Sequence, residues 1–172
     1  SAGERISMAL MAITLNSLGV NAISFTGSQS GVFTDGSHSN ARIDDIKAFR
    51  VRDEIKKGKV VIIAGFQGVN PQTKEVTTLG RGGSDTTAVA MACAFSASRC
   101  DILTDVEGIF SGDPRIKQTR PYLFPHLTYD LALEMTYWGA SVLHYRSVEL
   151  AERNKIPLNV NLSTKLKAGT LI

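Results

Sequence analysis

The stretch Leu79-Gly-Arg-Gly-Gly-Ser-Asp85 follows a short polar strand at Thr77-Thr78 and precedes an Ala-rich run over residues 86–97. The run predicts a helix, and Ser84 is a residue type that caps helix N-termini. Gly82 and Gly83 remove side chains just before that helix, so a ligand can approach the backbone closely. Backbone N–H groups at the positive end of a helix attract anions, and Arg81 adds a planar guanidinium suited to a carboxylate or phosphate. A turn that merely connects strand to helix is the alternative, and the neighbouring Arg and Ser-Asp favour the anion site.

Helix and strand patterns alternate on both sides of this stretch. Helices are predicted over residues 3–18, 46–57, 86–97, 129–137 and 140–153. Strands are predicted over residues 21–25, 41–43, 60–64, 101–105, 157–161 and 169–172, with a polar hairpin or loop at 26–40 and a hairpin arm at 74–78. This alternation is typical of an α/β domain with a mostly parallel sheet between helices.

Several local features refine these elements. The run Val60-Val-Ile-Ile-Ala64 predicts a central parallel strand buried on both faces. Asp44 or Asp45 is expected to cap the second helix, and Thr128 to cap the fourth. The first helix carries two apolar stripes, which predict burial on more than one side. The stripes are Ile6, Leu10 and Ile13, and Met11, Leu15 and Leu18.

Composition excludes several classes of function. The net charge is +3 from 19 basic and 16 acidic residues, and the charges are scattered, so no nucleic-acid or membrane partner is expected. Cys93 and Cys100 form no CxxC pair and are expected to be reduced thiols of a cytoplasmic protein. The histidines lie far apart in sequence, and no metal site is predicted.

The stretch around Arg81 also resembles a known family. Thr77-Thr-Leu-Gly-Arg-Gly-Gly-Ser-Asp-Thr-Thr-Ala88 is similar to the hallmark segment of the aspartokinases, in the amino acid kinase family. Four further segments resemble the same family in order: Gly3-Glu4, Gly65–Gly68, Thr104–Arg115 and Gly139–His144. The resemblance implies a three-layer α/β/α sandwich, with residues 1–172 as a single partial catalytic domain. The family's Lys-Phe-Gly-Gly motif has no counterpart here, so the domain is expected to be incomplete at its N-terminus and to lack regulatory domains.

The resemblance implies phosphorylation of the side-chain carboxylate of L-aspartate by ATP with Mg²⁺. It assigns Arg81 to a substrate carboxylate and Glu4 to the substrate amino group. Gly82, Gly83 and Ser84 would line the substrate and the transferring phosphate, and Asp85 would orient a lysine or Mg²⁺ in a catalytic role beside Arg81. A carboxylate acceptor is already ionised at pH 7, so no general base is needed. The reaction then requires that negative charge be neutralised and that the reacting groups be aligned.

The same resemblance makes residues 104–115 a nucleotide-binding loop. Thr104 and Asp105 would meet ribose hydroxyls, Phe110 would pack on the base, and Arg115 would pair with phosphate. Taken singly, each side chain has an ordinary structural explanation, and only the family resemblance favours nucleotide binding. The full set of implied nucleotide-binding residues is Ser84, Thr104, Asp105, Phe110, Ser111, Gly112, Asp113, Pro114, Arg115, Ser141 and Val142. Ser141 stands where family members carry a lysine, which leaves its backbone as the expected contact.

Two other functions remain open at this point. One is a different amino acid kinase or a nucleotide monophosphate kinase of the same family, and the other is a non-catalytic ligand-binding or assembly module. The chain is expected to be inactive alone and to associate with itself or with a missing N-terminal kinase segment and regulatory domains, as a homo-oligomer or hetero-oligomer.

Overall fold

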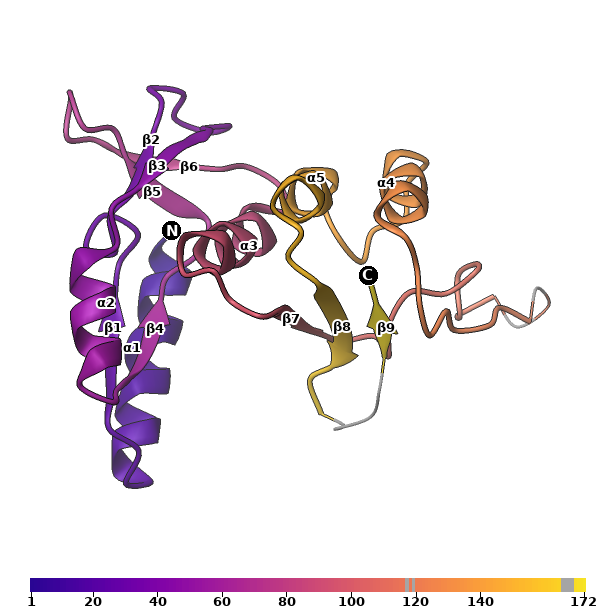
Figure 1. The fold of residues 1–172 in the computed structure, drawn as a ribbon, viewed down its shortest axis with the longest axis horizontal. Coiled ribbons are helices and arrows are strands. Elements are labelled where there is room, and N and C mark those ends of the chain that lie inside the picture. Colours follow the sequence, from indigo (N-terminus) through magenta and orange to yellow (C-terminus); the bar gives the residue numbers. More distant parts are fainter. Residues whose placement is uncertain (117, 119, 165–168) are drawn as a thin grey trace. The chain divides into compact units, whose positions relative to one another are not determined.

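A computed structural model describes residues 1–116, 118, 120–164 and 169–172 (Figure 1). The chain divides into two compact units, residues 1–87 and 88–172. Among the described residues, no helix is both long and apolar enough to cross a membrane.

A parallel strand pair and two helices form one part of the first unit. Strands β1 (Ala22–Phe25) and β4 (Val60–Ile63) pair in parallel, with Ala22 opposite Val60 and Phe25 opposite Ile63. Helix α1 (Ala2–Ser17) packs against both strands, and α2 (Phe49–Lys56) packs against β4. Ala12 of α1 is buried, and the small side chain lets the helix approach the strands closely.

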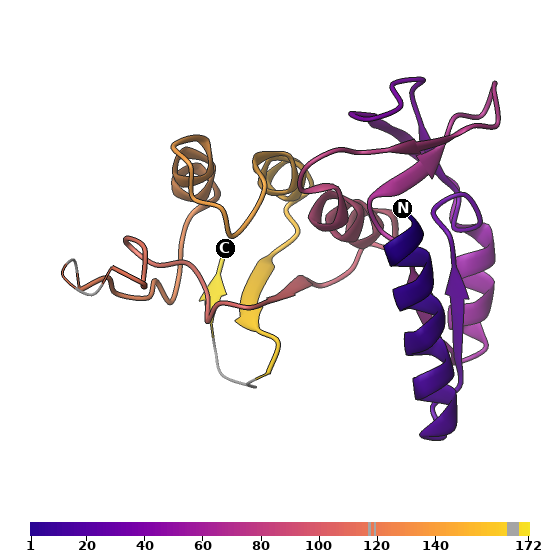
Figure 2. The same cartoon turned by 180° about the vertical axis from the view of Figure 1, so that it is seen from behind.

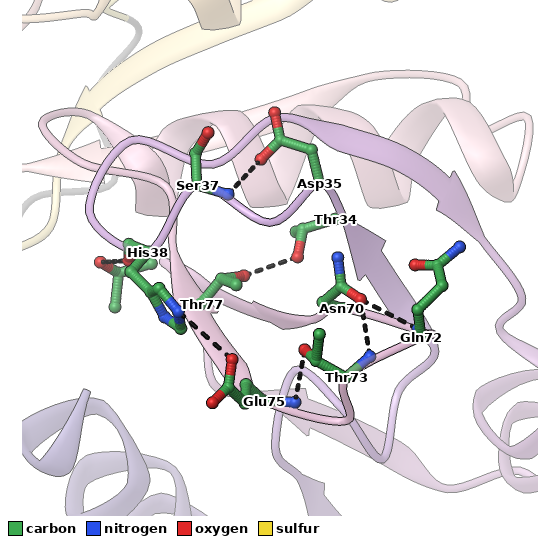
Figure 3. Close-up of polar contacts among 10 residues, drawn as sticks. Thr34, Asp35, Ser37, His38, Asn70, Gln72, Thr73, Glu75 and Thr77 are labelled. Carbon is green, nitrogen blue, oxygen red and sulfur yellow. Dashed lines mark hydrogen bonds and ion pairs between the residues drawn. The ribbon is translucent and has the colours of Figure 1, made fainter.

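A four-stranded sheet forms the other part of the first unit, in the order β3-β2-β5-β6. Its strands are β2 (Val32–Thr34), β3 (Ile43–Ile46), β5 (Gln67–Val69) and β6 (Val76–Thr78). Strands β2 and β5 are parallel, and the two outer pairings are antiparallel. The predicted hairpin arm is therefore confirmed, with Asn70 holding the turn by accepting the Gln72 and Thr73 amides on its Oδ1 at 2.9 and 3.0 Å (Figure 3).

The second unit packs helices around a three-stranded sheet. Strands β7 (Cys100–Thr104) and β8 (Leu158–Leu162) are parallel, and β9 (Thr170–Leu171) adds to β8 in the antiparallel sense (Figure 2). Helices α4 (Tyr129–Tyr137) and α5 (Tyr145–Asn154) contribute apolar faces to one core. Val148, Leu158 and Val160 lie at its centre and are fully buried. Helix α3 (Gly83–Ala94) begins in the first unit and continues into the second, where Val89 joins the core.

Tertiary pairing overturns several predictions of local structure. Asp44 and Asp45 lie in β3, where Asp45 is opposite Phe33, and α2 begins only at Phe49 without a side-chain cap. Ile43 and Ile46 provide the partly buried positions of β3, so pairing with β2 outweighs the capping tendency of aspartate.

Two further predictions need correction at the ends of elements. The predicted helix over 140–153 begins at Tyr145, because His144 in an extended conformation caps it and accepts the Arg146 amide at 3.3 Å. Strand β4 is not buried on both faces, since Val60 is 45% exposed and Val61–Ile63 are only partly buried. The predicted cap of α4 is confirmed, with Thr128 Oγ1 accepting the Leu131 amide at 3.3 Å.

Candidate functional site

A tight turn joins β6 to α3 in the first unit. Gly80 and Gly82 both have a left-handed backbone, with φ of 76° and 69°, which residues with a Cβ rarely adopt. The Gly83 amide donates to the Gly80 carbonyl at 3.1 Å and closes the turn. Gly80 and Gly82 therefore have a structural role, because the turn requires the left-handed backbone that both adopt.

Gly83 has a different reason for lacking a side chain. A Cβ on Gly83 would lie 2.9 Å from Leu79 Cβ and 2.9 Å from Phe66 Cδ2. The side-chain position of Gly83 is therefore occupied by Phe66 and Leu79, while the contact of its backbone with a ligand stays a prediction. Its amide also serves the turn, so the backbone of Gly82 and Ser84 remains as the candidate anion contact.

Helix α3 starts at Gly83, two residues earlier than the start at Asp85 that a Ser84 cap would require. Ser84 lies in the first turn of the helix, with its side chain exposed, and Asp85 lies in the same turn. The Arg81 side chain is also exposed. A guanidinium beside the positive end of a helix forms a surface that attracts carboxylates and phosphates.

Polar contacts from Thr34 of β2 and from the loop 35–41 stabilise the strand that leads into this turn (Figure 3). The Thr77 and Thr34 hydroxyls are hydrogen-bonded at 2.6 Å and fully buried. The amide and hydroxyl of Thr78 both donate to the His38 carbonyl at 2.9 Å. His38 Nε2 lies 3.3 Å from Glu75 Oε2. Strand β6 is therefore fixed just before Gly80.

Glu4 lies in the first turn of α1, and its Oε2 atom is buried. A hydrogen bond from its own backbone amide lowers the pKa of the Glu4 carboxyl. Glu4 thus places a carboxylate in the first turn of α1, where it can pair with a cationic group.

Gln67 connects the start of α1 to the strand beside the turn, a connection that the sequence analysis missed. Its side chain is 1% exposed, accepts from Arg5 Nε at 3.0 Å and donates to the Ser1 carbonyl at 3.3 Å. The adjacent residue Phe66 contacts the Arg81 turn, because its carbonyl accepts the Leu79 amide at 2.9 Å. Residues from three distant segments therefore meet within the first unit. The available signal in the sequence was a polar residue shortly after the apolar run 60–64, since a glutamine that becomes buried needs hydrogen-bond partners.

The predicted nucleotide-binding loop lies in the second unit, after β7. Thr104 ends the strand and donates through Oγ1 to Asp105 Oδ1 at 3.1 Å. Phe110 forms an isolated antiparallel bridge with Leu123 and is partly buried. Ser111 Oγ accepts the Tyr122 amide at 3.0 Å, so this hydroxyl has a structural partner within the loop.

Arg115 is bound to Asp113 in the same loop. Its Nε lies 3.0 Å from Asp113 Oδ1 and its Nη2 lies 2.9 Å from Oδ2, a bidentate pair. The hydrogen bond from the Arg115 side chain lowers the pKa of Asp113. The pair with Asp113 fixes the position of the guanidinium. The Arg115 side chain is 89% exposed, so its outer face is accessible to a ligand. Gly112 and Pro114 are exposed beside it.

The remaining predicted residues lie near the start of α5. Ser141 is exposed, whereas Val142 is partly buried and packs against the core of the second unit. No group of three or more His, Cys, Asp or Glu side chains suited to a metal ion is found in the described part of the chain. The two units thus carry two separate sets of candidate residues, one around Arg81 and Glu4 and one along residues 104–115.

Comparison with known proteins shows the family of this chain. The model of the amino acid kinase family matches residues 1–160. The chain belongs to the amino acid kinase family. Among its relatives, the aspartokinase of Mycobacterium tuberculosis is 54% identical over 172 residues, which is 100% of this chain and 41% of that protein. The chain therefore spans about two fifths of the length of the curated relatives it matches.

Solved structures of amino acid kinases share the fold. Escherichia coli aspartokinase III in complex with aspartate and ADP has a TM-score of 0.90 and 34% identity, covering 98% of this chain and 38% of that one. The UMP kinase of Ureaplasma parvum has a TM-score of 0.67 and 19% identity, covering 96% of this chain and 66% of that one, and this likeness concerns the fold alone. The predicted α/β class with parallel strand pairing is confirmed.

Proposed function

We propose that this chain is the part of an aspartate kinase that recognises L-aspartate and much of the nucleotide. The carrying observation is that the first unit presents the exposed guanidinium of Arg81 at the glycine turn where α3 starts and the carboxylate of Glu4 in the first turn of α1. These are the complements of the carboxylate and amino groups of an acidic amino acid. The 54% identity to an aspartokinase supports the same substrate.

In the proposed reaction a side-chain carboxylate oxygen of L-aspartate attacks the γ-phosphorus of ATP. The bond from this phosphorus to the β–γ bridging oxygen breaks, giving 4-phospho-L-aspartate and ADP. Arg81 binds a carboxylate of the substrate and Glu4 binds its amino group. The Gly82 and Ser84 backbone faces the anionic groups, so the residues align charge and neutralise it.

The nucleotide is assigned to the second unit. Thr104 and Asp105 meet the ribose, Phe110 meets the base, and Arg115 meets phosphate through its exposed face. Ser111–Pro114, Ser141 and Val142 complete this surface. Mg²⁺ is assigned to the ATP phosphates, because it is commonly held by one or two carboxylates together with phosphate oxygens. Asp85, in the first turn of α3, is the carboxylate assigned to orient a lysine or Mg²⁺.

The test is turnover in a chimeric enzyme. In this chimera residues 1–172 replace the matching 172 residues of the M. tuberculosis aspartokinase. Hydroxylamine traps an acyl phosphate as a hydroxamate, and we expect ATP-dependent hydroxamate with L-aspartate and much less with L-glutamate. ADP release with UMP but not with L-aspartate would make the chain part of a nucleotide monophosphate kinase. Calorimetric binding of ATP and L-aspartate without any turnover would make it a ligand-binding module.

A further inference from the structure

Phe66 adopts an unusual backbone conformation beside the Arg81 turn. Its φ is 71°, in the left-handed region that a bulky residue rarely occupies. Both of its backbone polar groups have partners in distant segments. The amide donates to Thr87 Oγ1 at 3.0 Å, and the carbonyl accepts the Leu79 amide at 2.9 Å. These two bonds stabilise a conformation that is otherwise unfavourable.

Thr87 joins this residue to the beginning of α3. Its hydroxyl accepts the Phe66 amide and donates to the Gly83 carbonyl at 2.7 Å. The residue is only 3% exposed, so water does not readily replace either bond. A single buried hydroxyl therefore couples the segment after β4 to the glycine turn.

Packing at the same place leaves little freedom. A Cβ on Gly65 would lie 3.3 Å from Ser84 Cα, and one on Gly83 would lie 2.9 Å from the Phe66 ring. Two successive residues after β4 therefore lie directly against two successive residues at the start of α3. Movement of Phe66 would shift Gly83 and Ser84, and the Ser84 backbone belongs to the proposed anion site.

We infer that Thr87 is a positioning residue for aspartate binding, acting through Phe66 on the backbone of Gly82–Ser84. This inference rests on the proposed function. Thr87 is two residues beyond Asp85 and needs no contact with substrate for this role. Its effect is on the geometry that Arg81 and the adjacent amides present.

Three variants of the 172-residue chain separate this role from a general effect on stability. Thr87→Val keeps the side-chain shape and removes the hydroxyl, whereas Thr87→Ser keeps the hydroxyl. Thr86→Val is the matched control, because Thr86 makes the same kind of bond to a carbonyl four residues back, to Gly82 at 2.9 Å, and this bond stays within the turn and helix.

The measurements are amide exchange and chemical shift by NMR, with titration of L-aspartate and ATP. In Thr87→Val we expect the Phe66 amide to exchange about tenfold faster, the effect of losing one hydrogen bond, and the Gly82–Ser84 resonances to move. The Kd for L-aspartate should rise about tenfold while the Kd for ATP changes less than about twofold. Thr87→Ser should resemble the wild-type chain, and Thr86→Val should leave the exchange of the Phe66 amide unchanged.

Thr87→Val with lowered thermal stability but unchanged aspartate Kd and unchanged Gly82–Ser84 resonances would overturn the inference. A wild-type chain in which L-aspartate moves no resonance at Arg81–Ser84 would instead count against the proposed function. In that case the exchange rate of Phe66 and the shifts at Gly82–Ser84 still decide whether Thr87 positions the turn.

Discussion

Arg81 has the chemistry of a carboxylate clamp because its planar fork is exposed at a rigid turn. Arg81→Lys replaces two directed donors with a point charge, and we expect it to lower kcat/KM for L-aspartate in the chimeric enzyme. Truncation to alanine should cost about 2–5 kcal/mol in the same parameter. Arg52→Lys is the control, since Arg52 is an exposed arginine of α2. Unchanged kcat and KM in Arg81→Lys would remove Arg81 from the site.

Arg115 is proposed to bind phosphate while Asp113 holds its guanidinium in place. Arg115→Ala should weaken ATP binding more than adenosine binding, because adenosine carries no phosphate. Calorimetry with both ligands measures this difference. Arg99→Ala is a matched control, since Arg99 is also exposed and pairs with an aspartate two residues away, at 3.1 Å. Equal losses for ATP and adenosine would show that Arg115 acts on something other than phosphate.

At the scale of elements, α2 carries a carboxylate at its unfavourable C-terminal end. Two lysines compensate for it, since Glu54 lies 2.7 Å from Lys57 Nζ and 2.6 Å from Lys59 Nζ. The hydrogen bond from Lys57, followed by that from Lys59, lowers the pKa of Glu54 from 4.5 to about 2.

A carboxyl with a depressed folded-state pKa stabilises the fold above its unfolded pKa and loses that effect as pH falls. The contribution of Glu54 should therefore be present above about pH 4.5 and disappear toward pH 2. Chemical unfolding of wild type and Glu54→Gln across this range is the measurement. We expect the stability difference to shrink as the pH falls, and a difference independent of pH would contradict the assigned pKa.

Helix α1 has one side that packs and another that does not. Ala12 is 8% exposed against the strands, whereas Leu10 and Ile13 are 58% and 65% exposed. The expected burial on more than one side is thus not realised within this chain, and an exposed apolar face favours association. Leu10→Gln with Ile13→Gln should reduce self-association in sedimentation experiments with little change in stability.

Ala12→Leu should destabilise the fold by about 1–3 kcal/mol through overpacking, which thermal unfolding would report.

At the scale of the whole molecule, the 172-residue chain is predicted to be inactive alone. It contains no counterpart of the family's Lys-Phe-Gly-Gly segment, so part of the charge stabilisation for the transferring phosphoryl group would be missing. Losing one such donor lowers a rate by roughly 10²–10³. Hydroxamate trapping with the chain alone, and with a separately made N-terminal piece, measures this. Turnover by the chain alone at the rate of the chimera would contradict the account.

The sequence by itself determined the α/β class, the elements around the core and the family. The periodic apolar runs and the Arg81–Asp85 stretch are local signals. They predict the fold class and the family correctly because each depends on residues that are close together in the chain. The α4 cap at Thr128 and the hairpin ending at Thr78 are of this kind. The assigned substrate contacts and the single domain over residues 1–172 stay predictions.

Only the tertiary structure decided which competing local preference prevailed. Asp44 and Asp45 are good capping residues, yet pairing with β2 placed them in a strand. Phe66 and Leu79 occupy the position that a side chain on residue 83 would need, so packing is one reason for a glycine there. The roles of Gln67 and Thr87 depend on partners 20 or more residues away, at Arg5 and Phe66. Such contacts follow from how distant segments pack together, which no local pattern encodes.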